Sequence, residues 1–269
     1  MLGKGLADLG SIVAHFDELS VGRDRHIAAS PTVGYEQRMR HRFVRECVEL
    51  ARPTRVLDVG CGNGRDAIPI ASMRPETAVL GVDISPGMIA EARSCLVGHE
   101  EGVRRRVRFD VADLSLPGAV EDGTFDLVVC SEVLEHVPEW PAMMENLRRA
   151  LAPGGHAVVT LPNRASLYGA NRWLIERRNA RRGLRPWPHP YDAWKRPREV
   201  LGVAREVGFE PVLERGACYL PGFTLFAKLP AAAEPVIRAV AASEPVLRRL
   251  VPRAAYMYCV LLRRKAGAA

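Results

Sequence analysis

The sequence contains neither a long apolar run nor paired cysteines, and both absences narrow the class of protein. No stretch approaches the roughly 18 consecutive apolar residues from which a membrane-spanning helix is built. None of the six cysteines belongs to a Cys-x-x-Cys pair; they are Cys47, Cys61, Cys95, Cys130, Cys218 and Cys259. This spacing disfavours a disulfide scaffold and is typical of a protein from a reducing compartment.

The N-terminus also lacks the pattern of a secretory signal. Asp8 interrupts its short apolar stretch, and no small-residue cleavage site follows. We therefore expect a cytoplasmic protein. Its net charge of +7 favours contact with anionic partners, either phospholipid or nucleic acid, although dispersed and solvated arginines would give the same balance.

Apolar runs alternate with helix-sized segments from about residue 52 to residue 161. The expected strands are 55–60, 77–83, 106–110, 125–130 and 156–161, and the expected helices between them are 65–73, 86–96 and 141–151. Strands that alternate with helices form βαβ units and a parallel sheet that is covered on both faces. The pattern therefore predicts a Rossmann-like α/β fold.

The flanking segments have a different character. Residues 1–51 are predicted to form a helical N-terminal cap, and residues 52–269 the main domain, with inserted lid segments at about 162–195 and 220–252. The last apolar run, 256–265, ends in cations, a common way of protecting an exposed strand. We therefore expect it to be an edge strand.

The strongest motif is VLDVGCGNGRDA at residues 56–67. Here a buried strand runs into Asp58, after which Gly60, Gly62 and Gly64 alternate before a helix. Glycines permit a tight turn and a close ligand, while the helix start offers free N–H groups. Because Arg65 stands where a dinucleotide loop needs glycine or alanine, the motif disfavours an NAD-type pyrophosphate cradle. A purely structural loop is the alternative to a ligand site.

Two later carboxylates extend this candidate ligand site. Asp83 ends the second strand about 20 positions after the glycine loop, where a carboxylate can accept hydrogen bonds from both ribose hydroxyls. Asp113 follows the third strand and could accept from an adenine amino group, with Ile84 and Leu114 on the two faces of the ring. A turn-forming role is the alternative for Asp113.

The segment after the fourth strand, SEVLEHVP, is expected at the carboxyl end of the sheet, where open α/β sheets bind their ligands. One helical turn would place Glu132, Glu135 and His136 on one face. Such a group could bind a divalent cation, or His136 could act as a base because histidine titrates near neutral pH. Packing and pocket lining is the simpler interpretation.

In order, the motifs VLDVGCGNG, GVDIS, DVADL, FDLVVCSEVLEH and LAPGG resemble the class I S-adenosylmethionine (SAM)-dependent methyltransferases over about residues 52–161. The resemblance implies a seven-stranded, mostly parallel sheet with an antiparallel last strand, its final two strands lying at 211–217 and 256–265. It also implies an enzyme that uses SAM as methyl donor. The implied SAM-binding residues are Asp58, Gly60, Gly62, Gly64, Asp83, Ile84, Asp113, Leu114 and Ser131. From their place in the chain, Tyr35 and Arg38 are candidates to close over SAM.

Within that family the sequence is most similar to the ubiquinone-biosynthesis O-methyltransferases of the type 11 small-molecule group. It also resembles the RNA 3′-terminal 2′-O-methyltransferases, in which a Glu-x-x-Glu-His segment and a later histidine bind a divalent ion. The resemblance implies catalytic roles for Glu132, Glu135 and His136, and a metal such as Mg²⁺ on these residues together with His189. His189 departs from the pattern because it lies between two prolines.

The two insertions bear on the methyl acceptor. The first combines apolar side chains, among them Trp173 and Leu174, with many arginines, a mixture that suits an anionic membrane surface or a nucleic-acid strand. A lid that never meets a membrane is equally open. Because 220–252 is apolar with few groups for base recognition, we expect O-methylation of a lipophilic or aromatic, catechol-like small molecule or secondary metabolite. RNA 3′-terminal methylation and N- or C-methylation of a small molecule are the alternatives.

Overall fold

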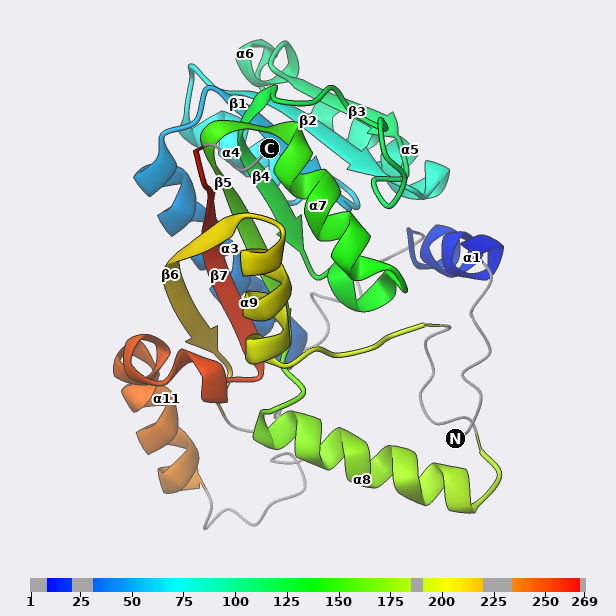
Figure 1. Cartoon of the computed structure of the whole chain (residues 1–269), viewed down its shortest axis with the longest axis vertical. Helices are drawn as coiled ribbons and strands as arrows, with labels where there is room; N and C mark the ends of the chain where they lie inside the picture. The colour runs from blue at the N-terminus through cyan, green and yellow to red at the C-terminus, as the bar shows by residue number, and fades with distance from the viewer. Residues whose placement is uncertain (1–8, 21–30, 185–190, 220–233, 267–269) are drawn as a thin grey trace.

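A computed structural model of the chain describes residues 9–20, 31–184, 191–219 and 234–266 (Figure 1). Within these residues, seven strands form one sheet in the order β3-β2-β1-β4-β5-β7-β6. They are β1 (Arg55–Val59), β2 (Ala78–Asp83), β3 (Val107–Val111), β4 (Phe125–Ser131), β5 (Leu151–Pro162), β6 (Phe209–Ala217) and β7 (Met257–Arg264). The first five pair in parallel, and β7 runs antiparallel to both β5 and β6. The predicted fold class and the antiparallel last strand are thereby confirmed.

Helices lie on both faces of this sheet (Figure 1). The α-helices are α1 (Leu9–Ser20), α3 (Pro31–Ala51), α4 (Ala67–Met73), α5 (Pro86–Val97), α6 (Glu101–Arg104), α7 (Trp140–Ala150), α8 (Leu167–Arg181), α9 (Pro197–Glu206) and α11 (Glu234–Leu250); two 3₁₀ turns are η1 (Leu134–His136) and η3 (Pro252–Ala254). None of the described helices is both long and apolar enough to cross a membrane.

The strands are apolar on both sides because side chains alternate between two covered faces. On β4, Val129 belongs to the apolar cluster that includes α3, α4 and α5, whereas Val128 belongs to the cluster that includes α7 and α9. Neither valine is exposed to solvent. The near-continuous Val-rich runs of the sequence follow directly from this three-layer arrangement.

The expectation that the final strand lies at an edge is wrong. β7 lies between β5 and β6, and the edges of the described sheet are β3 and β6. Its residues from Met257 to Leu262 are buried, and only the terminal arginines, Arg263 and Arg264, reach solvent. The cations therefore mark the end of an interior strand.

Helix α1 is fixed against the start of α5. Ser85 caps α5 by accepting a hydrogen bond from the Met88 N–H, with Pro86 in the first turn. The Ser85 hydroxyl donates to the carboxylate of Asp17 on α1, which also accepts from the Gly87 N–H at 2.9 Å. These bonds place α1 beside the carboxyl end of β2.

The described lead-in is helical, as expected, since α1 and α3 both precede β1. Helix α3 buries Phe43, Val44 and Cys47 in the core, so it is packed onto the sheet. The division of the chain at residue 51 and the limits of the insertions stay predictions. Parts of both insertions, 185–190 and 220–233, lie outside the described residues.

We predict that Phe43→Ala lowers the free energy of unfolding by about 3–5 kcal/mol, because the ring is 1% exposed and its removal leaves a cavity between α3 and the sheet. Leu50→Ala on the same helix is the control, since Leu50 is 60% exposed and should change stability by less than about 0.5 kcal/mol. Urea unfolding measures both. Equal losses in the two variants would contradict this packing of α3.

Candidate active site

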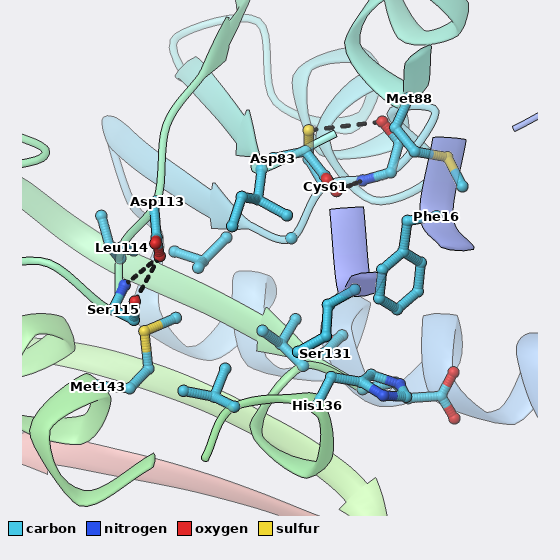
Figure 2. A pocket seen from close by; sticks show the side chains of 18 of the residues that line it. Phe16, Cys61, Asp83, Met88, Asp113, Leu114, Ser115, Ser131, His136 and Met143 are labelled. Carbon is cyan, nitrogen blue, oxygen red and sulfur yellow. Dashed lines mark hydrogen bonds between the residues drawn. The ribbon is translucent and has the colours of Figure 1, made fainter. Parts of the chain in front are cut away.

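A pocket lies at the carboxyl ends of β1, β2 and β4, where α1 and α3 also reach it (Figure 2). Its walls combine the glycine loop, the ends of these strands, the η1 turn and the start of α7. The side chains that the sequence did not single out include Ile12 and Phe16 from α1, Gln37 and Arg40 from α3, and Asn63, Asp66, Met88, Ser115, Val133 and Met143 from the loops and helices around it.

Most of the residues that the sequence assigned to SAM line this one pocket. Those that do are Gly60, Gly62, Asp83, Ile84, Asp113, Leu114 and Ser131, whereas Asp58 and Gly64 do not. These seven residues come from four segments of the chain, the first and last of which, at Gly60 and Ser131, are 71 positions apart. Their roles toward SAM stay predictions, but the structure brings these seven together.

The glycines at the two ends of the loop are required by close packing. Gly60 and Gly64 both have left-handed backbone angles, with φ of 64° and 83°. A Cβ on Gly60 would lie 2.4 Å from Cγ2 of Val133, and one on Gly64 would lie 2.7 Å from the ring of Phe109. The loop therefore approaches the η1 region and β3 more closely than any other residue would permit.

Asp83 holds this loop in place. One of its carboxylate oxygens accepts from the Gly62 N–H at 2.8 Å, and the other accepts from the Ser85 N–H at 2.9 Å. The side chain is nearly buried at the pocket wall. A carboxylate can accept several hydrogen bonds, and accepting from ribose hydroxyls is within its chemistry.

Asp113 forms a local turn and also lines the pocket. One carboxylate oxygen accepts from both the N–H and the hydroxyl of Ser115, at 2.9 and 2.6 Å, which forms a local turn. The residue nevertheless lines the pocket together with Ile84 and Leu114 (Figure 2). The turn-forming role is therefore observed, and the role toward adenine stays a prediction.

A buried ionic network at the other end of the pocket was missed by the sequence reasoning. The Arg40 guanidinium forms a salt bridge with Asp66 and donates to the amide oxygen of Gln37 at 3.2 Å. Burial alone would raise the pKa of Asp66, but Arg40 and a hydrogen bond with His41 lower it to about 2. The signal was present, because Arg40 lies three positions before Phe43 on the apolar face of α3, where an arginine needs a partner.

Asp58 and Tyr35 face other parts of the molecule. Asp58 is 2% exposed behind the loop and accepts from the Ala67 N–H, and burial, reinforced by Asp66, raises its pKa well above the usual range. The Tyr35 hydroxyl donates to Glu244 of α11 at 2.6 Å. Neither Tyr35 nor Arg38 lines the pocket, so the idea that they close over SAM is not supported.

The expected helical turn through Glu132, Glu135 and His136 does not form. The backbone of Glu132 is left-handed, with φ of 56°, and only Leu134–His136 make a 3₁₀ turn. Glu132 and His136 line the pocket, whereas Glu135 does not. A shared helix face for the three residues depended on that turn, and the left-handed backbone of Glu132 prevents it from forming.

Two carboxyl groups near this turn favour the neutral form. Burial, followed by the charge of Glu132, raises the pKa of Glu135 well above its usual range, and one oxygen of Glu135 has no hydrogen-bond partner among the described residues. The same two causes raise the pKa of Glu36 to about 7. Glu135 is therefore a poor proton acceptor at neutral pH.

His136 has a defined tautomer in this pocket. Its Nδ1 lies 3.0 Å from the carbonyl oxygen of Tyr191. Because a carbonyl only accepts, Nδ1 carries the hydrogen and Nε2 carries the lone pair. Burial lowers the pKa of His136, which keeps the ring neutral, and the Phe16 ring packs edge-on at 5.1 Å between centroids.

This geometry does not fit the metal site that the resemblance implied. In the part of the chain that the structure describes, no group of three or more His, Cys, Asp or Glu side chains converges to hold an ion. Glu135 does not line the pocket that Glu132 and His136 share. The fourth implied ligand, His189, lies outside the described residues.

We predict that Asp83→Ala weakens SAM binding by about 10- to 100-fold, the loss expected when hydrogen bonds to a charged group are removed. Isothermal titration calorimetry measures the affinity. Asp110→Ala is the matched control: this carboxylate lies on β3 and is 63% exposed, outside the pocket lining. Unchanged SAM affinity in Asp83→Ala would show that the ribose does not bind there.

Comparison with known proteins identifies the family of the chain. A family model described as a methyltransferase domain matches residues 34–214. The ubiquinone biosynthesis O-methyltransferase of Ralstonia nicotianae is 34% identical over 170 residues, which are 62% of this chain and 67% of that protein. The trans-aconitate 2-methyltransferase of Methylobacterium nodulans is 39% identical over 116 residues, which are 43% of this chain and only 41% of that protein. The match thus spans less than half the length of one curated relative and two thirds of the other.

The fold is shared with a solved structure. Magnesium protoporphyrin IX methyltransferase from Synechocystis PCC 6803, crystallised with bound SAH, superposes with a TM-score of 0.63 at 19% identity, covering 96% of this chain and all of that one (100%). At this identity the likeness concerns the fold alone. Because the family model spans well over half of the 269 residues, we conclude that the chain belongs to the methyltransferase-domain family and is a class I SAM-dependent methyltransferase.

Proposed function

We propose that the protein methylates an oxygen atom of a lipophilic or aromatic small molecule, with His136 as the general base. The observation that carries the proposal is the neutral imidazole at the pocket wall, whose Nδ1–H is held by the Tyr191 carbonyl. The curated relatives named as ubiquinone biosynthesis O-methyltransferases support oxygen as the acceptor atom. A phenol or hydroxyl acceptor must lose a proton, and a neutral imidazole can take it.

Apolar side chains line part of the pocket wall near this base, together with the carboxylate of Glu132. Phe16, Val133, Val137 and Pro138 line the pocket near His136. Such side chains shield an aromatic or alkyl acceptor from water, and none of these four can hydrogen-bond a nucleobase. The composition of the wall therefore supports a lipophilic acceptor over an RNA end.

In the proposed mechanism SAM, when bound, supplies an activated methyl group on a sulfonium. Asp83 and Asp113 orient its adenosine part, and the glycine loop and Arg40 lie on the side left for the amino-acid part. This alignment of acceptor oxygen, methyl and sulfur lowers the barrier by several kcal/mol. His136 Nε2 accepts the proton of the acceptor hydroxyl as the oxygen bonds to the methyl carbon and the methyl–sulfur bond breaks, which leaves S-adenosylhomocysteine, the methylated oxygen and a protonated imidazole.

We predict that His136→Gln lowers kcat/KM by about 10²- to 10⁴-fold, the usual contribution of a general base. In the wild type, kcat/KM should be level above neutral pH and fall as the pH drops through a pKa below the ordinary 6.5 of histidine, because Nε2 must be unprotonated. Transfer of labelled methyl from SAM to an alkylcatechol measures this. His99→Gln, on the exposed surface, is the control; wild-type turnover in His136→Gln would remove the base from the proposal.

We further propose that helix α8 contacts an anionic membrane surface, from which a lipophilic acceptor would reach the pocket. One face of α8 exposes Leu167, Trp173 and Leu174, followed by Arg177, Arg178 and Arg181. The only acid of the helix, Glu176, is not fully exposed and is paired with Arg172. Apolar anchors beside unopposed cations match the interface of an anionic bilayer. Figure 1 shows α8 extending away from the sheet at the end of β5.

We predict that the protein floats with phosphatidylglycerol vesicles and not with phosphatidylcholine vesicles, and that combined Arg177→Gln, Arg178→Gln and Arg181→Gln abolishes flotation. The matched control removes three exposed cations elsewhere, Arg104, Arg105 and Arg108, and should still float. Equal loss of flotation in both variants would show that vesicle binding depends on net charge alone and not on α8. Binding to RNA without binding to vesicles would replace the membrane with a nucleic acid and overturn the proposal.

A further inference from the structure

A short segment from the first insertion lies against the turn that carries His136. We call residues 191–195 the strap. The Ala193 N–H donates to the Glu135 carbonyl at 2.8 Å, and the Tyr191 carbonyl accepts from Nδ1 of His136 at 3.0 Å. The strap thus contacts the η1 turn through two of its own residues, and one of these contacts is to the base itself.

The far end of the strap is fixed to the sheet. Lys195 pairs with Asn163 just beyond the end of β5, and its carbonyl accepts from the Arg164 N–H at 2.9 Å. Trp194 is nearly buried against Tyr256, with 5.4 Å between ring centroids. The strap is therefore anchored at one end, and its position over His136 depends on what holds residue 192.

Arg172 of α8 holds that residue. The arginine is 8% exposed, although it belongs to a helix that otherwise presents arginines to solvent. Its Nη1 donates to the Asp192 carboxylate at 2.8 Å, its Nη2 donates to the Asp192 carbonyl at 2.6 Å, and its guanidinium lies 4.5 Å from the centroid of the Trp194 ring. Nε donates to Glu176 at 2.7 Å. Every nitrogen of the guanidinium is thereby used, and two of them hold the strap.

We call the contacts of Arg172 with Asp192 the clamp. The position of Asp192 explains why the clamp affects His136. It lies between Tyr191 and Ala193, the two residues that touch the η1 turn. Fixing both its carboxylate and its carbonyl restricts the peptide on each side, including the carbonyl that receives the imidazole N–H. Because that carbonyl decides which ring nitrogen carries the proton, the clamp acts on the tautomer of His136.

We infer that Arg172 is a positioning residue: through Asp192 and the Tyr191 carbonyl it keeps His136 in the Nδ1–H tautomer, which leaves the lone pair on Nε2. The consequence for methyl transfer rests on the proposed role of His136 as base. Helix α8 then has two roles: Arg172 holds the strap beside the active site, and the exposed arginines lie on another face of the helix.

The experiment measures the tautomer directly, without an acceptor. In ¹⁵N-labelled protein, long-range ¹H–¹⁵N NMR spectra distinguish a protonated from an unprotonated ring nitrogen, and His136→Gln assigns the signal. The wild type should show Nδ1 protonated and Nε2 unprotonated at neutral pH. Arg172→Gln should show averaged shifts for the two nitrogens, Arg172→Lys an intermediate pattern, and Arg177→Gln, an exposed arginine of the same helix, the wild-type pattern.

The pH titration of the same signal is the second readout. The charged or titratable groups that act on His136 are Asp192 from the strap, Glu132 from the start of the turn and His15 from α1. Freeing Asp192 from its arginine should change the midpoint of the His136 titration, whereas Arg177→Gln should not. With an alkylcatechol as acceptor, kcat should fall about 10-fold in Arg172→Gln, a loss within the range expected for a misplaced general base. The affinity for SAM should stay unchanged.

The outcomes separate this inference from the proposed function. A wild-type tautomer and titration midpoint in Arg172→Gln would overturn the inference, whatever happens to turnover. A changed tautomer with unchanged kcat would keep the clamp and remove His136 as the base. If circular dichroism shows that Arg172→Gln does not fold, Asp192→Asn breaks the same link from the other side. It is judged by the tautomer alone, because the loss of the Asp192 charge would itself move the titration midpoint.

Discussion

The aligned ends of the parallel strands are the constraint on which the rest of the site depends. β1 pairs with β2 on one side and β4 on the other, and Val59 lies opposite both Val82 and Cys130. The residues that follow these positions, Gly60, Asp83 and Ser131, therefore emerge at one edge of the sheet although they are far apart in the chain. Val59, Val82 and Cys130 are all buried, so the ends of these three strands are fixed within the core.

Segments outside the sheet complete the pocket by specific polar contacts. Asp17 ties α1 to the start of α5, and Arg40 joins α3 to the glycine loop through Asp66. The strap joins the first insertion to the η1 turn through Ala193 and Tyr191. Each of these contacts joins residues distant in sequence and is largely shielded from water, where a hydrogen bond to a charge is strong and an unpaired charge is costly.

The sequence predicted the parts of the fold that depend on local pattern. The strands at residues 55–60 and 125–130 were recognisable because β-branched runs bounded by glycine and charged residues fit a covered sheet. Asp83 and Asp113 could be placed because each follows a strand. The interior position of β7 could not be seen, since terminal cations look alike at an edge strand and at the exposed end of a buried one.

The errors at the site also arose because long-range contacts are not visible in local sequence patterns. The left-handed backbone of Glu132 is imposed by its neighbours, including its N–H bond to the Thr160 carbonyl, and glutamate carries no local preference for it. Arg40 and Arg172 were counted among many arginines, and only their buried partners distinguish them from solvated ones. Long-range polar pairing was thus the part of the site that local patterns did not contain.

The most direct test of the account is a crystal structure of the protein with S-adenosylhomocysteine. The account predicts adenine between Ile84 and Leu114, ribose hydroxyls on Asp83, and the sulfur open toward the space beside His136. In the same structure Nδ1 of His136 should still face the Tyr191 carbonyl. A ligand bound elsewhere, or a sulfur separated from His136 by Glu132 or the wall of α1, would contradict both the site and the mechanism built on it.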